Sequence, residues 1–233
     1  MKCLTTLFFI GLFCLSVSAQ TKMTDLEFDG YRGNVRTVSI ETMPISGSGY
    51  VQLKNKRVVW EKWSYDTYGR KSEEYNPQAR SRVTYRTIDG VKTSSLKVEK
   101  GEPSPPLNLK FAYEYDSHGR VKAERIYLSD DKSPSLKTFE YDENGRISKN
   151  IDNELDSTTS AVYKYDNTGN LIEKIEEQKG KGEFGSDSKR RTVYSAYKVD
   201  VHGNWTERKS TMYSDGTDDP YVSMDFQVFA YYK

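Results

Sequence analysis

The chain has 233 residues with nearly balanced charge, 35 Lys and Arg against 34 Asp and Glu, and a formal net charge of +1 at pH 7. This balance provides no basic excess for binding nucleic acid or an anionic membrane surface. Aromatic residues make up 13% of the chain, with 18 Tyr. Because disordered chains are poor in aromatic residues, the composition predicts a folded protein.

The first predicted element is a secretory signal peptide over residues 1–19. Lys2 supplies a short positive region, residues 4–17 are almost entirely apolar, and Val17-Ser18-Ala19 has small residues where a signal peptidase cleaves. The apolar run is too short for a membrane-spanning helix. The sequence therefore predicts cleavage near Ala19, export to the periplasm or cell surface, and no membrane span in the mature chain.

Both cysteines, Cys3 and Cys14, lie within the segment that is expected to be removed. The mature chain then has neither a disulfide nor a Cys-based zinc site. Phe13 is bulky where a lipid-attachment motif needs a small residue, which argues against a lipid anchor at Cys14. An exported domain without disulfides suits a bacterial envelope.

A repeated segment organises the rest of the chain. Each copy alternates aromatic and polar residues and then has Asp, two variable residues, Gly, and Arg or Asn. Asp89-Gly90 marks a degenerate copy, and Gly33-Asn34-Val35-Arg36 is a candidate opening unit. A period in the twenties indicates one supersecondary unit per repeat. The five clear copies are 63–70, 113–120, 139–146, 163–170 and 197–204.

Each repeat is predicted to form a β-hairpin. The alternation has the period of a half-buried strand, Asp can accept backbone N–H groups of the turn, and Gly tolerates positive φ. The spacing fits a three-residue hairpin loop. The expected structural turn residues are Asp66, Gly69, Asp116, Gly119, Asp142, Gly145, Asp166, Gly169, Asp200 and Gly203.

The predicted fold is all-β: tandem antiparallel β-hairpin repeats forming a curled, meander-like sheet. We assign residues 20–233 to a single domain. The proline-rich stretch from Pro103 to Pro106 would allow a division into two domains, but the same repeat lies on both sides of it.

The motifs Tyr115-Asp116-x-x-Gly119-Arg120 and Tyr141-Asp142-x-x-Gly145-Arg146 resemble the YD repeat, also called the RHS repeat, of bacterial surface and toxin-associated proteins and animal teneurins. The likeness covers about residues 55–210 and is greatest to small exported bacterial proteins with a single array. It implies curling antiparallel sheets that act as shells, adhesive surfaces or carbohydrate-binding scaffolds without catalytic residues. A chain this short has too few units for a shell, and Asn replaces the motif's Arg at Asn170 and Asn204.

The candidate ligand-binding residues are the aromatic side chains of the repeats. Rows of exposed aromatic rings can stack on sugars or receive another protein's apolar patch. The alternative is that these rings pack the concave face of their own sheet. The candidates are Trp60, Trp63, Tyr113, Tyr115, Tyr141, Tyr163, Tyr197 and Trp205.

No catalytic, metal or cofactor site is predicted. His118 and His202 occupy the same position in two turns, where exposure is expected. Residues 180–185 match G-x-G-x-x-G without the strand and helix that a nucleotide site needs. The acidic stretch 215–219 offers oxygens to calcium, but it lacks EF-hand spacing.

The predicted function is that of an exported, non-catalytic binding or scaffold protein that presents its aromatic sheet to a glycan or to an envelope protein partner. Two alternatives remain open. One is an envelope hydrolase that uses Asp/Glu pairs. The other is a structural array that joins an assembly through its open sheet edges.

Overall fold

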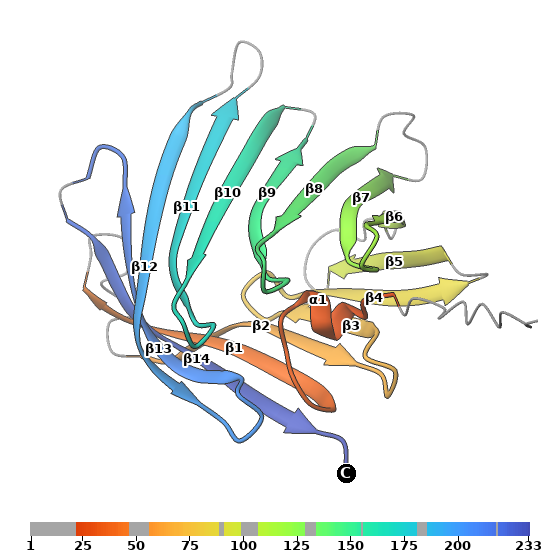
Figure 1. Cartoon of the computed structure of the whole chain (residues 1–233), viewed down its shortest axis with the longest axis horizontal. Coiled ribbons are helices and arrows are strands. Elements are labelled where there is room, and N and C mark those ends of the chain that lie inside the picture. Colours follow the sequence, from red (N-terminus) through yellow and green to blue (C-terminus); the bar gives the residue numbers. More distant parts are fainter. Residues whose placement is uncertain are drawn as a thin grey trace, which may run out of the picture.

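The computed structural model describes residues 22–46, 56–88, 91–98, 107–128, 134–154, 156–180, 186–217 and 219–233, so the predicted signal peptide lies outside the described residues. Fourteen antiparallel strands in these ranges form one closed barrel (Figure 1). They are β1 (Val35–Ser46), β2 (Val58–Tyr65), β3 (Lys71–Asn76), β4 (Ser81–Ile88), β5 (Val91–Val98), β6 (Leu107–Tyr115), β7 (Val121–Leu128), β8 (Ser135–Tyr141), β9 (Ile147–Asn153), β10 (Ser157–Tyr165), β11 (Leu171–Gly180), β12 (Ser188–Val199), β13 (Trp205–Ser214) and β14 (Tyr221–Tyr231).

The predicted all-β fold of antiparallel hairpins is confirmed, but the curled sheet is closed into a barrel, because β1 pairs with β14. The hairpin chemistry specifies how neighbouring strands pair, but closure depends on pairing between the two ends of the chain. Each of the fourteen described strands has a neighbour on both sides. None of these strands offers the open edge that assembly by edge-strand pairing requires.

The five Asp-x-x-Gly turns lie at one end of the barrel, here called the turn end (Figure 1). They share this end because the strands alternate in direction and each of these turns follows an even-numbered strand. The start of β1 and the end of β14 lie there too.

The turn after β8 illustrates the local geometry of the repeats. The Asp142 backbone N–H donates to the Arg146 carbonyl at 2.8 Å. The Asp142 Oδ1 atom accepts the backbone N–H groups of Asn144 at 3.0 Å and Arg146 at 2.9 Å. Gly145 has a φ of 77°, which a side chain would disfavour. A single carboxylate therefore organises the turn, while Gly provides its left-handed residue.

Successive repeats contact each other through Arg and Tyr side chains. The Arg120 guanidinium lies 4.4 Å from the Tyr141 ring centroid, and the Tyr141 hydroxyl donates to the Val121 carbonyl at 2.8 Å. Arg146 lies over Tyr165 in the same way, at 4.5 Å. A buried phenol needs a hydrogen-bond partner, and each partner here belongs to the preceding repeat. These contacts fix the spacing of adjacent hairpins.

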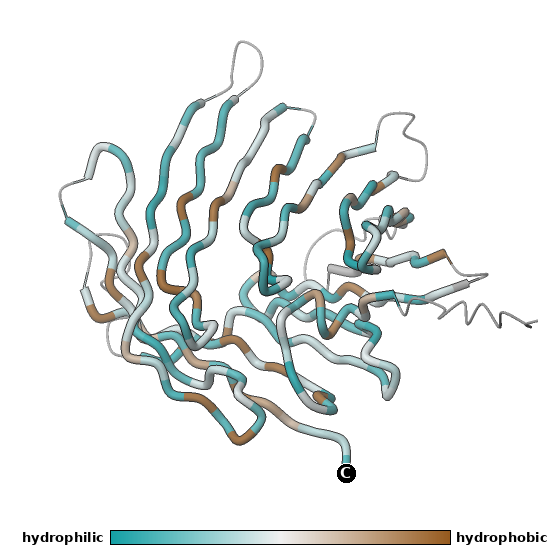
Figure 2. Tube along the Cα trace, in the orientation of Figure 1, coloured by the Kyte–Doolittle hydropathy of each residue, from teal (hydrophilic) through white to brown (hydrophobic). Residues whose placement is uncertain are grey.

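The outer wall carries charged side chains across β10, β11 and β12. Glu173 pairs with both Lys164 and Arg191, and Glu177 pairs with Lys189. Hydrophilic residues predominate along these strands, with hydrophobic residues at a few positions (Figure 2). Exposed ion pairs add little stability, but they make this part of the wall a surface suited to water.

Residues 22–34, here called the N-terminal segment, cross the turn end before β1 begins. They include the short helix α1 (Asp25–Phe28), capped by reciprocal hydrogen bonds between Thr24 and Glu27. The Met23 and Leu26 N–H groups donate to the carbonyls of Gly119 and Gly69, at 3.0 and 2.9 Å. The segment is thereby attached to the turns at two separate places.

The largest buried cluster lies where this segment meets the first and last strands. It contains Leu26, Tyr31, Val35, Val38 and Tyr65, and Val38 is completely buried. Apolar packing is therefore concentrated at the turn end, and burial of such side chains supplies most of the stabilising free energy. The N-terminal segment thus covers part of the turn end of the barrel.

Candidate functional site

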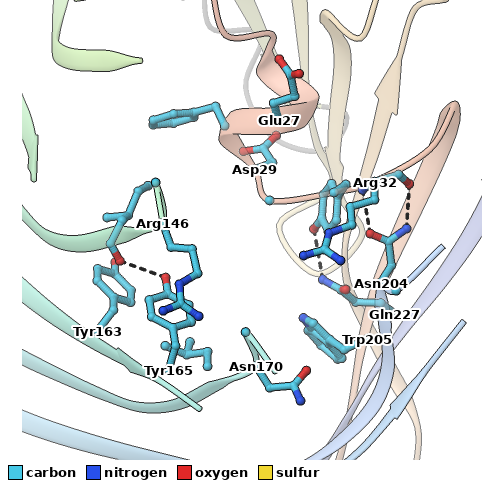
Figure 3. A pocket seen from close by; sticks show the side chains of 18 of the residues that line it. Glu27, Asp29, Arg32, Arg146, Tyr163, Tyr165, Asn170, Asn204, Trp205 and Gln227 are labelled. Carbon is cyan, nitrogen blue, oxygen red and sulfur yellow. Dashed lines mark hydrogen bonds between the residues drawn. The ribbon is translucent and has the colours of Figure 1, made fainter. Parts of the chain in front are cut away.

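A cavity of about 460 Å³ lies at the turn end, between the N-terminal segment and the strands from β8 to β14 (Figure 3). We call it the turn-end cavity. Its size falls within the range of small-molecule sites, about 300–1,000 Å³. Three arginines and three side-chain amides share its lining with aromatic rings, which belong to Phe28, Tyr31, Tyr141, Tyr163, Tyr165 and Trp205.

Asn204 holds the N-terminal segment against the cavity wall. Its Oδ1 atom accepts the Arg32 backbone N–H at 2.7 Å, and its Nδ2 atom donates to the Arg32 carbonyl at 2.8 Å (Figure 3). The Nδ2 atom also donates to the Tyr231 hydroxyl at 2.9 Å. The side chain is only 4% exposed, so these bonds satisfy a buried amide. The Asn that replaces Arg in this repeat binds the backbone of Arg32.

Gln227 is a buried polar side chain of the cavity lining whose bonding is incomplete. It is 6% exposed, and its Nε2 atom donates to the Tyr31 hydroxyl at 3.1 Å. Its Oε1 atom accepts no hydrogen bond from the described part of the protein. A buried acceptor without a donor costs about 1–3 kcal/mol. Gln227 therefore borders the turn-end cavity and has a buried acceptor without a partner in the described residues.

Arg208 and Trp205 form a stacked pair on β13, and the Trp205 ring lies beside Asn204 and Gln227 (Figure 3). The Arg208 guanidinium lies 4.0 Å from the Trp205 ring and 3.9 Å from the Tyr194 ring. Its Nε atom lies 3.5 Å from the Asp225 carboxylate. Arg is suited to this position because its planar cation stacks on aromatic faces. The stack fixes the orientation of the Trp205 ring at the cavity.

Arg32 and Arg146 border the turn-end cavity and also line a polar hollow of about 470 Å³ beside the turns. Arg146 donates two hydrogen bonds to Asp142 at 2.7 Å. Arg32 is exposed, and no ion pair joins its guanidinium to the described residues. The two arginines therefore lie between the turn-end cavity and the polar hollow. The charge of Arg146 is compensated by Asp142, whereas that of Arg32 has no ion-pair partner in the described residues.

The two carboxylates of the cavity lining already have partners. Glu27 accepts the Thr24 backbone N–H at 2.8 Å. Asp29 pairs with Lys71 at 3.0 Å and accepts the Tyr65 hydroxyl. One oxygen of each carboxylate is thus engaged by the fold. Among the other polar groups of the lining, the Arg32 guanidinium has no ion pair and the Gln227 Oε1 atom has no donor in the described residues.

A second hollow, of about 370 Å³, lies on the inner wall between β1, β2 and the strands from β11 to β14. Trp60 borders it together with Ser210 and Ser223, whose hydroxyls lie 3.2 Å apart. These hydroxyls already bond each other.

The aromatic candidates from the sequence are divided among several places. Tyr141, Tyr163 and Trp205 line the turn-end cavity, and Trp60 lines the second hollow. Burial raises the pKa of Tyr141 to about 12. Tyr163 donates its hydroxyl to Asn150 at 2.9 Å. Their rings pack between hairpins and at the same time form cavity wall.

The remaining candidates line neither hollow. Trp63 packs 6.0 Å from the Tyr31 ring, and Tyr113 packs 6.4 Å from the Tyr115 ring. Tyr197 donates its hydroxyl to the Leu171 carbonyl. A ligand-binding role for these side chains stays a prediction. Arg32, Asn204 and Gln227 were not among the candidates, although the replacement of Arg by Asn at 204 was a visible signal.

The repeat Asp residues are engaged within their own turns. The Thr168 hydroxyl, together with N–H groups of Asn170, lowers the pKa of Asp166 to about 2. A carboxylate held ionised in this way is a poor proton donor. Burial instead raises the pKa of Glu124 and of Glu61. These two lie on other strands of the barrel, away from the lining of the turn-end cavity.

Among the described residues, no three His, Cys, Asp or Glu side chains form a group that could hold a metal ion. His118 and His202 are both exposed, and the His202 ring stacks 4.4 Å from Tyr231. The G-x-G-x-x-G match at 180–185 and the acidic stretch at 215–219 lie partly outside the described residues. In the described ranges, no helix has the length and apolar character needed to cross a membrane.

Comparison with known proteins places the chain in no family. No family model matches it, and no curated protein matches it. Among solved structures, a porin-like protein from Bacteroides uniformis ATCC 8492 is 10% identical, with a TM-score of 0.29. The alignment covers 85% of this chain and 98% of that chain.

Proposed function

We propose that this is an exported, non-catalytic binding protein that takes a small saccharide into the turn-end cavity. The cavity combines aromatic rings with side-chain amides and guanidinium groups. Saccharides present apolar C–H faces and hydroxyl edges, which aromatic rings and planar polar side chains respectively complement. A concave hollow of this size suits such a molecule better than it suits the flat patch of a protein partner.

The observation that carries the proposal is the Gln227 Oε1 atom. It is a buried acceptor without a partner in the described residues, and it belongs to the cavity lining. Buried polar groups are nearly always hydrogen-bonded in folded proteins. A hydroxyl of a bound sugar would supply the missing donor.

The surroundings of the cavity support binding in the cell envelope. The predicted signal peptide directs the chain to export, and the charged wall over β10 to β12 suits an aqueous compartment. The YD-repeat resemblance also favours a carbohydrate ligand. The first two observations favour an aqueous compartment, and the resemblance favours a glycan as the occupant of the cavity.

Isothermal titration of the mature protein with methyl glycosides and short oligosaccharides tests the proposal. Gln227→Leu removes the free acceptor at nearly unchanged volume, and we expect it to weaken binding about tenfold. Gln178→Leu, at an exposed position of β11, is the matched control and should bind normally. If no saccharide binds to the folded protein, or if Gln227→Leu binds as the control does, the proposal is wrong.

A further inference from the structure

We infer that the saccharide in the turn-end cavity carries an anionic group and that Arg32 binds this group at the cavity opening. The inference rests on the proposed function and specifies the ligand class. It starts from a difference in charge compensation among the cavity arginines. Arg146 is paired with Asp142 and Arg208 with Asp225, whereas Arg32 has no ion-pair partner in the described residues.

The position of Arg32 follows from the repeat pattern. The Nη1 atom of Arg120 lies 3.7 Å from the point where a Cβ on Gly145 would stand, and Arg146 covers Gly169 in the same way at 3.6 Å. The next position in the series lies over Gly203. The preceding repeat has Asn instead of Arg at 170 and has no guanidinium to fill it.

Arg32 fills the vacant position from the N-terminal segment. Its Nη1 atom lies 3.1 Å from the point where a Cβ on Gly203 would stand, and its backbone is held by Asn204 on both sides of the residue. In the repeats the covering Arg is bound by the Asp of its own turn, as Arg146 is by Asp142. Arg32 is placed in the same way over Gly203, but no turn Asp among the described residues binds its guanidinium.

Neither carboxylate of the lining forms an ion pair with Arg32. Asp29 is paired with Lys71 at 3.0 Å, and Glu27 accepts hydrogen bonds from the neutral Thr24 in the cap of α1. An Arg guanidinium presents planar N–H pairs that match a carboxylate or a phosphate. An anion at the opening would meet Arg32 there, while the sugar ring reaches inward to Trp205 and Gln227.

A uronic acid and a sugar phosphate share this chemistry, and matched ligands distinguish them. We would titrate the mature protein with methyl glycosides of glucose, galactose and mannose, their uronates, their 6-phosphates, and inorganic phosphate alone. The inference expects one anionic sugar to bind about tenfold more tightly than the neutral glycoside of the same ring. This preference should decrease at high salt, which screens an exposed charge pair.

Substitution assigns the preference to Arg32. Arg32→Gln should remove the tenfold preference, so that the anionic and neutral sugars of the same ring bind with similar affinity. Arg86→Gln, at an exposed position of β4, should keep the preference. Arg32→Lys keeps the charge but loses the planar fork, so the preference should fall by part of that amount.

The outcomes separate the two proposals. Equal binding of neutral and anionic sugars overturns the inference and leaves the proposed function intact. A preference that survives in Arg32→Gln also overturns it. Inorganic phosphate that binds as tightly as a sugar phosphate would mark a simple anion site. Failure of every sugar to bind overturns the proposed function and this inference together.

Discussion

Tyr231, in the last strand, stands opposite Val35, in the first, in the same register that Tyr141 and Ile147 have within an unbroken hairpin. Gly33 precedes this pair with a φ of 79°, like the glycines of the turns. The ends of the chain therefore reproduce the strand pairing of a repeat unit.

The hydrogen bonds at the closure follow the repeat as well. Tyr232 donates its backbone N–H to the Asn34 carbonyl at 2.9 Å, as Asp142 does to the Arg146 carbonyl at 2.8 Å. The barrel is thus closed by a hairpin unit that is split between the two termini. Noncovalent contacts hold this unit where a continuous turn holds the others.

Tyr231→Ala should destabilise the closure. Tyr231 bonds Asp200 and Asn204 and stacks on His202, so truncation removes ring packing and a buried hydrogen-bond partner. We expect a loss of about 2–3 kcal/mol of unfolding free energy, measured by urea denaturation. Tyr213→Ala, 43% exposed, is the control and should cost under about 1 kcal/mol. Equal losses would show that the closure has no special contribution.

Asn204→Ala should release the N-terminal segment. It removes both hydrogen bonds to the Arg32 backbone, leaving buried groups without partners, at a cost of about 2–3 kcal/mol. Hydrogen exchange should increase in residues 22–34. Asn170→Ala is the matched control, because Asn170 bonds only within its own turn, to Asp166 and Thr168. An exchange increase of the same size in the control would contradict the assignment.

Stability should fall in acid because of the turn carboxylates. The Thr168 hydroxyl, with the N–H groups of Asn170, holds the pKa of Asp166 at about 2, below its ordinary value of 3.8. The folded state prefers the ionised form, so this contribution is complete above pH 3.8 and is lost between about pH 3.8 and 2. Denaturation midpoints across this range, for wild type and Asp166→Asn, test it. The variant should lose less stability over this interval, and an identical acid dependence would contradict the role of Asp166.

Glu124→Gln should show the opposite pH dependence. Burial raises the pKa of Glu124 above 4.5, so the folded state prefers the protonated form and stability is lost as pH rises through the raised value. The Gln variant stays neutral. Its free energy of unfolding relative to wild type should increase from pH 4.5 towards pH 7. Urea denaturation at several pH values, with the exposed Glu143→Gln as control, checks this; a constant difference would contradict it.

The hairpin units could be derived from the sequence because their determinants are local. Asp142 and Gly145 stand three residues apart, and Asp142 bonds N–H groups two and four residues on. The alternation of Tyr and polar residues likewise marks two-faced strands over a few positions. Such signals depend on neighbours in the chain, and they are independent of how the whole sheet curves.

The cavity depended on residues that are far apart in the chain. Arg32 and Asn204 are separated by 172 positions, and Tyr31 and Gln227 by 196. No spacing in the sequence indicates that an Asn in the last turn will bind the N-terminal segment. The sequence by itself determined the turns and the faces of the strands, since local backbone chemistry controls them. Tertiary structure alone decided barrel closure, the path of the N-terminal segment and the uncompensated Arg32, because each arises from long-range pairing of the chain ends.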